Sequence, residues 1–79
     1  MDINQVDTTK EYTFSEALQE LLYKSNIIIT SKKTGDSYKI DKLSKVIILK
    51  FYNPVIASWQ RCTYILPEEI FDAWYITAE

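Results

Sequence analysis

The sequence predicts an α+β domain: an N-terminal helix packed on a small twisted antiparallel sheet of four to five strands, with a short helical turn before the last strand. Three observations carry this prediction. A stretch near the start has apolar residues at helical spacing, short β-branched and aromatic runs follow between turn signals, and the chain closes on an aromatic run. The 79 residues fit one domain over residues 13–79, after a polar and flexible lead over residues 1–12.

The helix is expected to begin after Thr13. Glu16 follows three residues later, which is the capping-box pattern in which two side chains satisfy free amides at a helix start. One apolar stripe follows at helical spacing: Phe14, Ala17, Leu18, Leu21 and Leu22. The helix should end near Lys24–Asn26 after about three turns.

The strands are delimited by turn residues. "IIITSKK" is a β-branched run, and Gly35 beside Asp36 predicts a hairpin turn before the next extended run. "KVIILKFY" is a further strand, ended by Pro54, which has no amide to donate within a sheet.

The last third of the chain contains a bent extended segment, a helical turn and a closing strand. "VIASWQRCTYI" is the extended segment, and Pro67 in "LPEEIFDA" suits the first position of a short helix. "WYIT" is then a strand held in the sheet, which would explain two large aromatic residues so near the end of the chain.

The strand "VIILKF" is apolar on both faces. Ile47, Leu49 and Phe51 share one face, whereas Val46 and Ile48 share the other. One helix covers only one face of a sheet, so we expect a second subunit on the other face, in a homodimer or homotetramer. The alternative is that residues 53–66 fold back over it.

Composition bears on stability and on chemistry. A single core of this size is marginally stable, and one cysteine, Cys62, excludes an internal disulfide that would stabilise it.

There is no histidine, so the usual zinc sites and the commonest general base are excluded. We expect no metal, no cofactor and no catalysis. Glu68, Glu69 and Asp72 are interpreted as solvated acids favoured by the dipole of a short helix.

The charge is unevenly distributed. The net charge of −2 argues against a nucleic-acid partner, yet residues 32–50 carry six lysines against two aspartates. One interpretation is a solvated hairpin whose lysines discourage edge aggregation. The other is a shallow patch that attracts a phosphate-bearing ligand. No stretch has the length of a membrane span or the pattern of a signal peptide, so we expect a cytoplasmic protein without a membrane partner.

Trp59 and Arg61 form the most specific local feature. Alternation in "SWQRCTY" places both on one face of a strand, where a ring can stack on a base and a guanidinium can bind phosphate. The alternative is that Trp59, like Trp74, is a core residue.

Several short motifs together resemble a family of small phage proteins. They are "FSEAL" at residues 14–18, a hydrophobic strand after the helix, Trp59 in a late strand, and an acid-x-Trp-Tyr-Ile ending at residues 72–76. The chain is similar to Thoeris anti-defence proteins of the signal-sequestering type, which have an "FGEAL" helix start and a "DWYI" end. The resemblance implies an α+β homotetramer that binds a cyclic ADP-ribose isomer between subunits and withholds it from its effector.

This sequence departs from that family pattern at three places. Ser15 replaces a glycine, Ala73 stands where an acid is common, and the "R-x-x-W" motif after the helix is missing. For a ligand of this class, the expected site residues are Trp59 or Trp74 for stacking, Arg61 for phosphate, and Asp72 with Asn53 for hydroxyl contacts. The alternative function is an inhibitor or interaction module that binds a host protein through the apolar face of the sheet.

Overall fold

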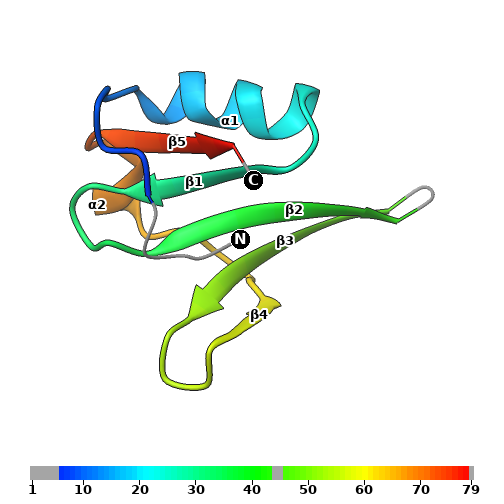
Figure 1. Cartoon of the computed structure of the whole chain (residues 1–79). Helices are drawn as coiled ribbons and strands as arrows, with labels where there is room; N and C mark the ends of the chain where they lie inside the picture. The colour runs from blue at the N-terminus through cyan, green and yellow to red at the C-terminus, as the bar shows by residue number, and fades with distance from the viewer. Residues whose placement is uncertain (1–5, 44–45, 79) are drawn as a thin grey trace.

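The computed structural model describes residues 6–43 and 46–78 and confirms the predicted α+β architecture (Figure 1). Its elements in chain order are α1 (Phe14–Tyr23), β1 (Ile27–Ser31), β2 (Ser37–Leu43), β3 (Val46–Asn53), β4 (Ser58–Arg61), α2 (Pro67–Ile70) and β5 (Trp74–Ala78). The strands form one sheet in the order β4-β3-β2-β1-β5, and every neighbouring pair is antiparallel.

Helix α1 begins with the expected capping box. The amide of Glu16 donates to Thr13 Oγ1 at 3.2 Å, and the amide of Thr13 donates to Glu16 Oε1 at 2.9 Å. The helix ends at Tyr23 with Lys24 as its C-cap, within the predicted boundary. Ala17 and Leu21 are its fully buried residues, so they fix the face that packs on the sheet.

Two turns close the hairpins on either side of the central strands. Gly35, between β1 and β2, has φ of 81°, a left-handed conformation that costs glycine little. Residues 54–57 form the turn between β3 and β4, where Asn53 Oδ1 accepts a hydrogen bond from the amide of Val55 at 3.0 Å. The bent segment predicted here therefore contributes only a short strand, β4.

The core lies between α1 and one face of the sheet. Its buried members are Ala17, Leu21, Ile29, Tyr38 and Trp74. Trp74 is completely buried, and its ring lies 5.2 Å from that of Phe14 and 5.7 Å from that of Tyr38, both tilted by 54°. The prediction of a closing strand locked into the sheet is confirmed.

The described part of the N-terminal lead is attached to β5. Tyr12 and Trp74 exchange two backbone hydrogen bonds of 2.8 Å, and the amide of Asp7 donates to Thr77 Oγ1 at 3.1 Å. Thr77 and Trp74 are three residues apart along β5, so their side chains lie on opposite faces of the sheet. Because Trp74 faces α1, Asp7 lies on the face opposite to α1. Residues 1–5 of the lead lie outside the described residues.

Strand β3 is only partly covered within one chain. Leu49 and Phe51 pack against the helix-side core, but none of the strand's residues is buried, and Val46 and Ile47 are 54% and 59% exposed. Residues that follow β4 do not cover the opposite face, because Cys62 and Ile65 pack against the helix-side core. The fold-back alternative is therefore wrong for the described residues.

Candidate ligand-binding site

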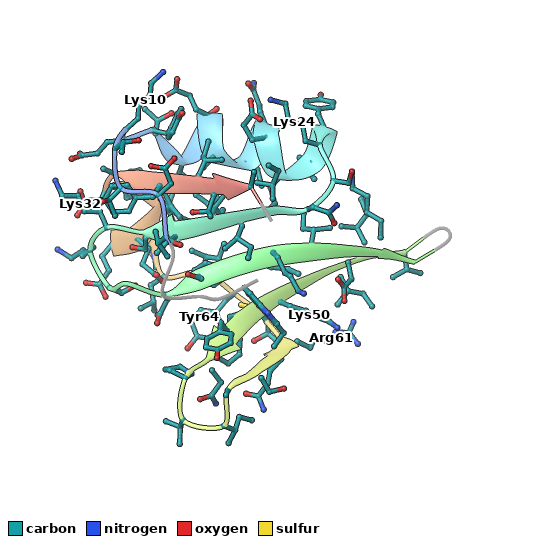
Figure 2. All side chains as sticks on the ribbon, in the orientation of Figure 1. Lys10, Lys24, Lys32, Lys50, Arg61 and Tyr64 are labelled. Atoms are coloured by element: carbon teal, nitrogen blue, oxygen red, sulfur yellow. The ribbon has the colours of Figure 1, made fainter. Side chains whose placement is uncertain are left out.

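Three cations form a row across the sheet face opposite to α1. In the strand register Lys39 of β2 pairs with Lys50 of β3, and Lys50 pairs with Arg61 of β4. Alternation places these three side chains opposite to Leu49 and Phe51, which pack in the core. Neighbouring strands lie about 4.8 Å apart, so the row spans about 10 Å. Figure 2 shows Lys50 and Arg61 together on β3 and β4.

An aromatic pair lies beside this row. Tyr52 pairs with Trp59 in the register, and their ring centres are 5.3 Å apart at an angle of 71°, an edge contact. Lys39 Nζ lies 4.7 Å from the centre of the Trp59 ring, within the range of a cation–π contact. Trp59 is half-buried, so these neighbours hold its ring in place while part of it stays in contact with solvent.

We call the surface formed by Lys39, Lys50, Tyr52, Trp59 and Arg61 the basic aromatic face. It offers a ring for stacking, a guanidinium that can bind phosphate through two nitrogens, and two ammonium groups for further negative charge. Base stacking on a ring and phosphate contacts to cations are the interactions that a nucleotide needs. This arrangement can hold a ligand of that kind.

One carboxylate interrupts the positive charge of the basic aromatic face. Asp41 Oδ2 lies 2.6 Å from Lys50 Nζ, and the two side chains are 34% and 30% exposed. The hydrogen bond from Lys50 is the main reason why the pKa of Asp41 lies below its ordinary value. Lys50 is thus already engaged when no ligand is bound.

The structure brings Trp59 and Arg61 together on one face, as the alternation predicted. Both belong to β4, at one edge of the sheet. Arg61 is exposed, and no carboxylate pairs with it within the described ranges 6–43 and 46–78. Its guanidinium is therefore available to an incoming anion.

The other predicted site residues lie elsewhere. Trp74 is a core residue of β5, at the far edge of the sheet from β4, about 19 Å away at four strand spacings. Asp72 is exposed just before β5, where its Oδ1 accepts the amide of Ala73 at 2.8 Å. Within one chain neither residue can share a ligand contact with Trp59.

Asn53 is also directed away from the basic aromatic face. It shares the helix-side face of β3 with Phe51, and its Nδ2 donates to Gln60 Oε1 at 3.1 Å.

Sequence reasoning missed Lys39, Lys50 and Tyr52 as site residues. Their positions on alternating strand faces were available as a signal, but the register that aligns them with Trp59 and Arg61 was not.

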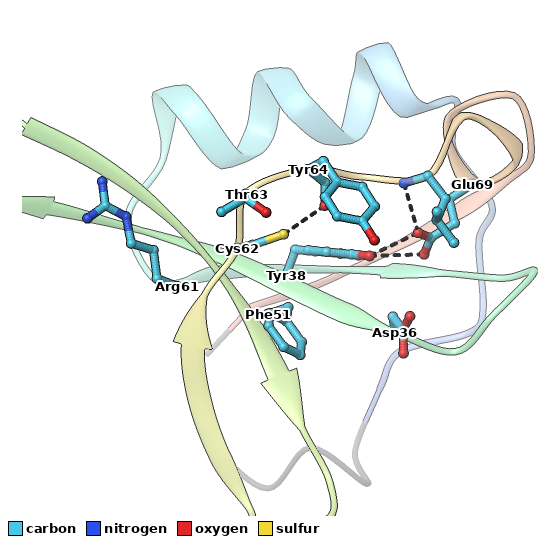
Figure 3. A pocket seen from close by; sticks show the side chains of 9 residues that line it. Asp36, Tyr38, Phe51, Arg61, Cys62, Thr63, Tyr64 and Glu69 are labelled. Atoms are coloured by element: carbon cyan, nitrogen blue, oxygen red, sulfur yellow. Dashed lines mark hydrogen bonds between the residues drawn. The ribbon is translucent and has the colours of Figure 1, made fainter.

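A cavity lies on the helix side of the sheet (Figure 3). It has a volume of about 290 Å³, and its lining includes Tyr38, Phe51, Arg61, Cys62 and Glu69. Figure 3 shows the Arg61 side chain directed away from Tyr38 and Glu69. Arg61 therefore belongs both to the rim of the cavity and to the cation row, and its guanidinium is directed away from the Tyr38–Glu69 end of the cavity.

Glu69 is buried at one end of this cavity. Its carboxylate accepts hydrogen bonds from the Tyr38 hydroxyl at 3.0 and 3.1 Å, from the Thr34 hydroxyl at 2.7 Å and from the Leu66 amide at 3.3 Å. The expectation that all three acids near α2 are solvated is wrong for Glu69, which is 0% exposed, whereas Glu68 is exposed. Burial, with the hydrogen bond to Glu69, raises the pKa of Tyr38 far above its ordinary value, so its hydroxyl stays protonated as a donor.

Residues 6–43 and 46–78 contain no helix that is both long and apolar enough to cross a membrane. Within the same ranges, no group of three or more cysteine, aspartate or glutamate side chains is arranged to hold a metal ion.

Comparison with known proteins identifies no relative. No protein-family model matches the chain, and no curated protein or solved structure gives a significant match.

Proposed function

We propose that the protein binds and sequesters a cyclic ADP-ribose-type nucleotide signal, without catalysis, and thereby acts as a phage anti-defence protein against Thoeris immunity in the bacterial cytoplasm. The observation that carries the proposal is the basic aromatic face: one half-buried indole beside a row of three cations on the sheet face opposite to α1. The motif resemblance supplies the biological setting.

The chemistry of such a ligand matches the groups on this face. A cyclic ADP-ribose isomer carries an adenine ring, two phosphates and ribose hydroxyls. Trp59 offers the stacking surface, Arg61 offers the fork for phosphate, and Lys39 and Lys50 add positive charge within one strand spacing of each other. No cofactor is needed for binding of this kind.

We further propose a homotetramer or a homodimer as the active assembly. Strand β3 supports this, because it is apolar on both faces and stays half-buried or exposed in the single chain. A second subunit on β3 would also bring groups of another chain near the basic aromatic face. Asp72 lies near the far edge of the sheet, and Asn53 is near Trp59 but directed to the helix side, so both would reach the ligand only across such an interface.

The test is direct binding of defined nucleotides to the purified protein. We expect a thermal upshift with a cyclic ADP-ribose isomer, since a ligand at one hundred times its Kd adds about 2.7 kcal/mol to the stability of the native state. Heating the complex and analysing the supernatant by mass spectrometry should return the ligand unchanged. No upshift with any ADP-ribose derivative would overturn the proposal, and a hydrolysed product would overturn its non-enzymatic part.

The second candidate function is an inhibitor or interaction module that binds a host protein. It is favoured by the exposed apolar residues of the β3–β4 turn, where Val55 is 89% and Ile56 is 56% exposed. Substituting both by serine would leave nucleotide binding intact if the first proposal holds. The same variant would lose the host target if the second one holds.

A further inference from the structure

The middle cation of the basic aromatic face is not free in the unliganded protein. Lys50 Nζ is held by Asp41 Oδ2 at 2.6 Å, whereas Arg61, one strand away, is exposed. Lys39, on the other side of Lys50, is placed over the Trp59 ring. An anion approaching from the β4 edge therefore meets Arg61 as the available cation and Lys50 as an occupied one.

We propose that Asp41 is a built-in competitor for the ligand's phosphates, and that the site selects nucleotides with two linked phosphates because only these displace Asp41 from Lys50. This inference rests on the proposed function and adds a specificity-determining residue to it. A single phosphate can bind Arg61 and leave the Asp41–Lys50 pair intact. A second, linked phosphate reaches the neighbouring cation, since Arg61 and Lys50 are directly paired in the register.

A linked second phosphate can replace the Asp41 carboxylate as the partner of Lys50 because of its local concentration and its charge. Once one phosphate is held by Arg61, the linked phosphate is presented to Lys50 at a high effective concentration. A partly exposed ion pair such as Asp41–Lys50 is weak, so it can be broken by this second contact. A monophosphate has no tethered second group and gains nothing by opening the pair.

The released carboxylate still has a cation nearby. Asp41 and Lys39 lie two residues apart on the same face of β2, about 7 Å along the strand. Lys39 already contributes to holding the pKa of Asp41 below its ordinary value. Displacement from Lys50 therefore leaves Asp41 solvated and close to Lys39 instead of buried without a partner.

The test compares Asp41→Asn with the parent protein by calorimetric titration of ADP-ribose and of AMP. The variant frees Lys50 without changing the size of the side chain, so we expect about threefold to tenfold tighter binding. The preference for ADP-ribose over AMP should shrink, since AMP then reaches Lys50 without competition. Glu68→Gln is the matched control, because it removes the same charge from an exposed residue of α2.

Two further measurements locate the effect at Lys50. In a Lys50→Gln background, Asp41→Asn should change the affinity for ADP-ribose by less than about twofold. In the parent protein, the pKa of the Asp41 carboxyl, followed by carbon-detected NMR, should rise when ADP-ribose saturates the site. An unchanged pKa in the saturated complex would overturn the inference even if Asp41→Asn disturbed the fold.

The outcomes separate this inference from the proposed function. If the parent binds ADP-ribose and Asp41→Asn binds it no more tightly than the parent does, the competitor role is refuted and the proposed function stands. If Asp41→Asn and Glu68→Gln tighten binding equally, net charge explains the gain and the competitor role is again refuted. If the parent binds neither nucleotide nor a cyclic ADP-ribose isomer, both proposals fall.

Discussion

The indole N–H of Trp74 donates a 2.8 Å hydrogen bond to the backbone carbonyl of Glu69, whose side chain in turn accepts from Tyr38. This relationship connects β5, α2 and β2 at the centre of the protein. It also explains how an aromatic residue so close to the end of the chain is completely buried. Its ring fills the core, and its one polar atom is satisfied.

Deleting residues 74–79 should therefore abolish the fold. The deletion removes Trp74 and the strand that pairs with β1 over five residues, in a domain whose total stability is small. Loss of one buried tryptophan alone costs about 3–5 kcal/mol. Circular dichroism of the truncated protein should show no cooperative thermal transition, and a melting curve like that of the parent would contradict this prediction.

Tyr38→Phe should destabilise the protein by about 1–3 kcal/mol, because the variant removes a donor to a buried carboxylate. Denaturant unfolding followed by tryptophan fluorescence measures this difference. Tyr23→Phe serves as the control, since Tyr23 is 84% exposed and the change should have no measurable effect. Equal denaturant midpoints for the two variants would show that the Tyr38–Glu69 hydrogen bond contributes nothing to the free energy of unfolding.

Alkaline pH should unfold the protein through the same tyrosine. The pKa of Tyr38 is raised in the folded state, chiefly by burial, so folding favours the neutral hydroxyl. Its contribution to stability is complete below the ordinary tyrosine pKa of about 10 and decreases as the pH rises above that value. The melting temperature should fall above pH 10 in the parent, and this fall should be shallower in Tyr38→Phe, where the titrating group is absent.

Assembly should depend on the open face of β3. We expect multi-angle light scattering at micromolar concentration to report a mass above the 9.3 kDa of one chain. Ile48 is half-buried on this face, so Ile48→Glu should dissociate or unfold the protein by placing a charge where a partner packs. A parent protein that is monomeric across this concentration range would contradict the prediction.

Arg61→Ala should weaken binding of a cyclic ADP-ribose isomer at least tenfold, about 1.4 kcal/mol, without changing the assembly. Arg61 is exposed at the end of β4 and is the only arginine of the chain, so no other side chain replaces its planar fork. Trp59→Ala should have a similar effect if the ring stacks on the ligand. Variants at both positions that assemble and bind as tightly as the parent would refute this placement of the site.

The helix start, the turns and the element order follow from local sequence. Thr13 and Glu16 cap α1 through bonds between residues three apart, Gly35 permits a left-handed turn, and Pro67 starts α2. Each of these effects acts over a few residues, so the sequence by itself determined them. Alternation along β4 likewise determined that Trp59 and Arg61 share a face, because a strand has a period of two.

Only the tertiary structure decided which tryptophan is core and which faces solvent. Trp74 and Trp59 both lie in edge strands, but Trp74 faces the core under α1, whereas Trp59 lies on the opposite face beside Lys39. The same long-range pairing aligns Lys39 and Lys50 with Arg61, and it buries Glu69 while Glu68 stays in solvent. These outcomes depend on contacts between residues far apart in the chain, which no local pattern encodes.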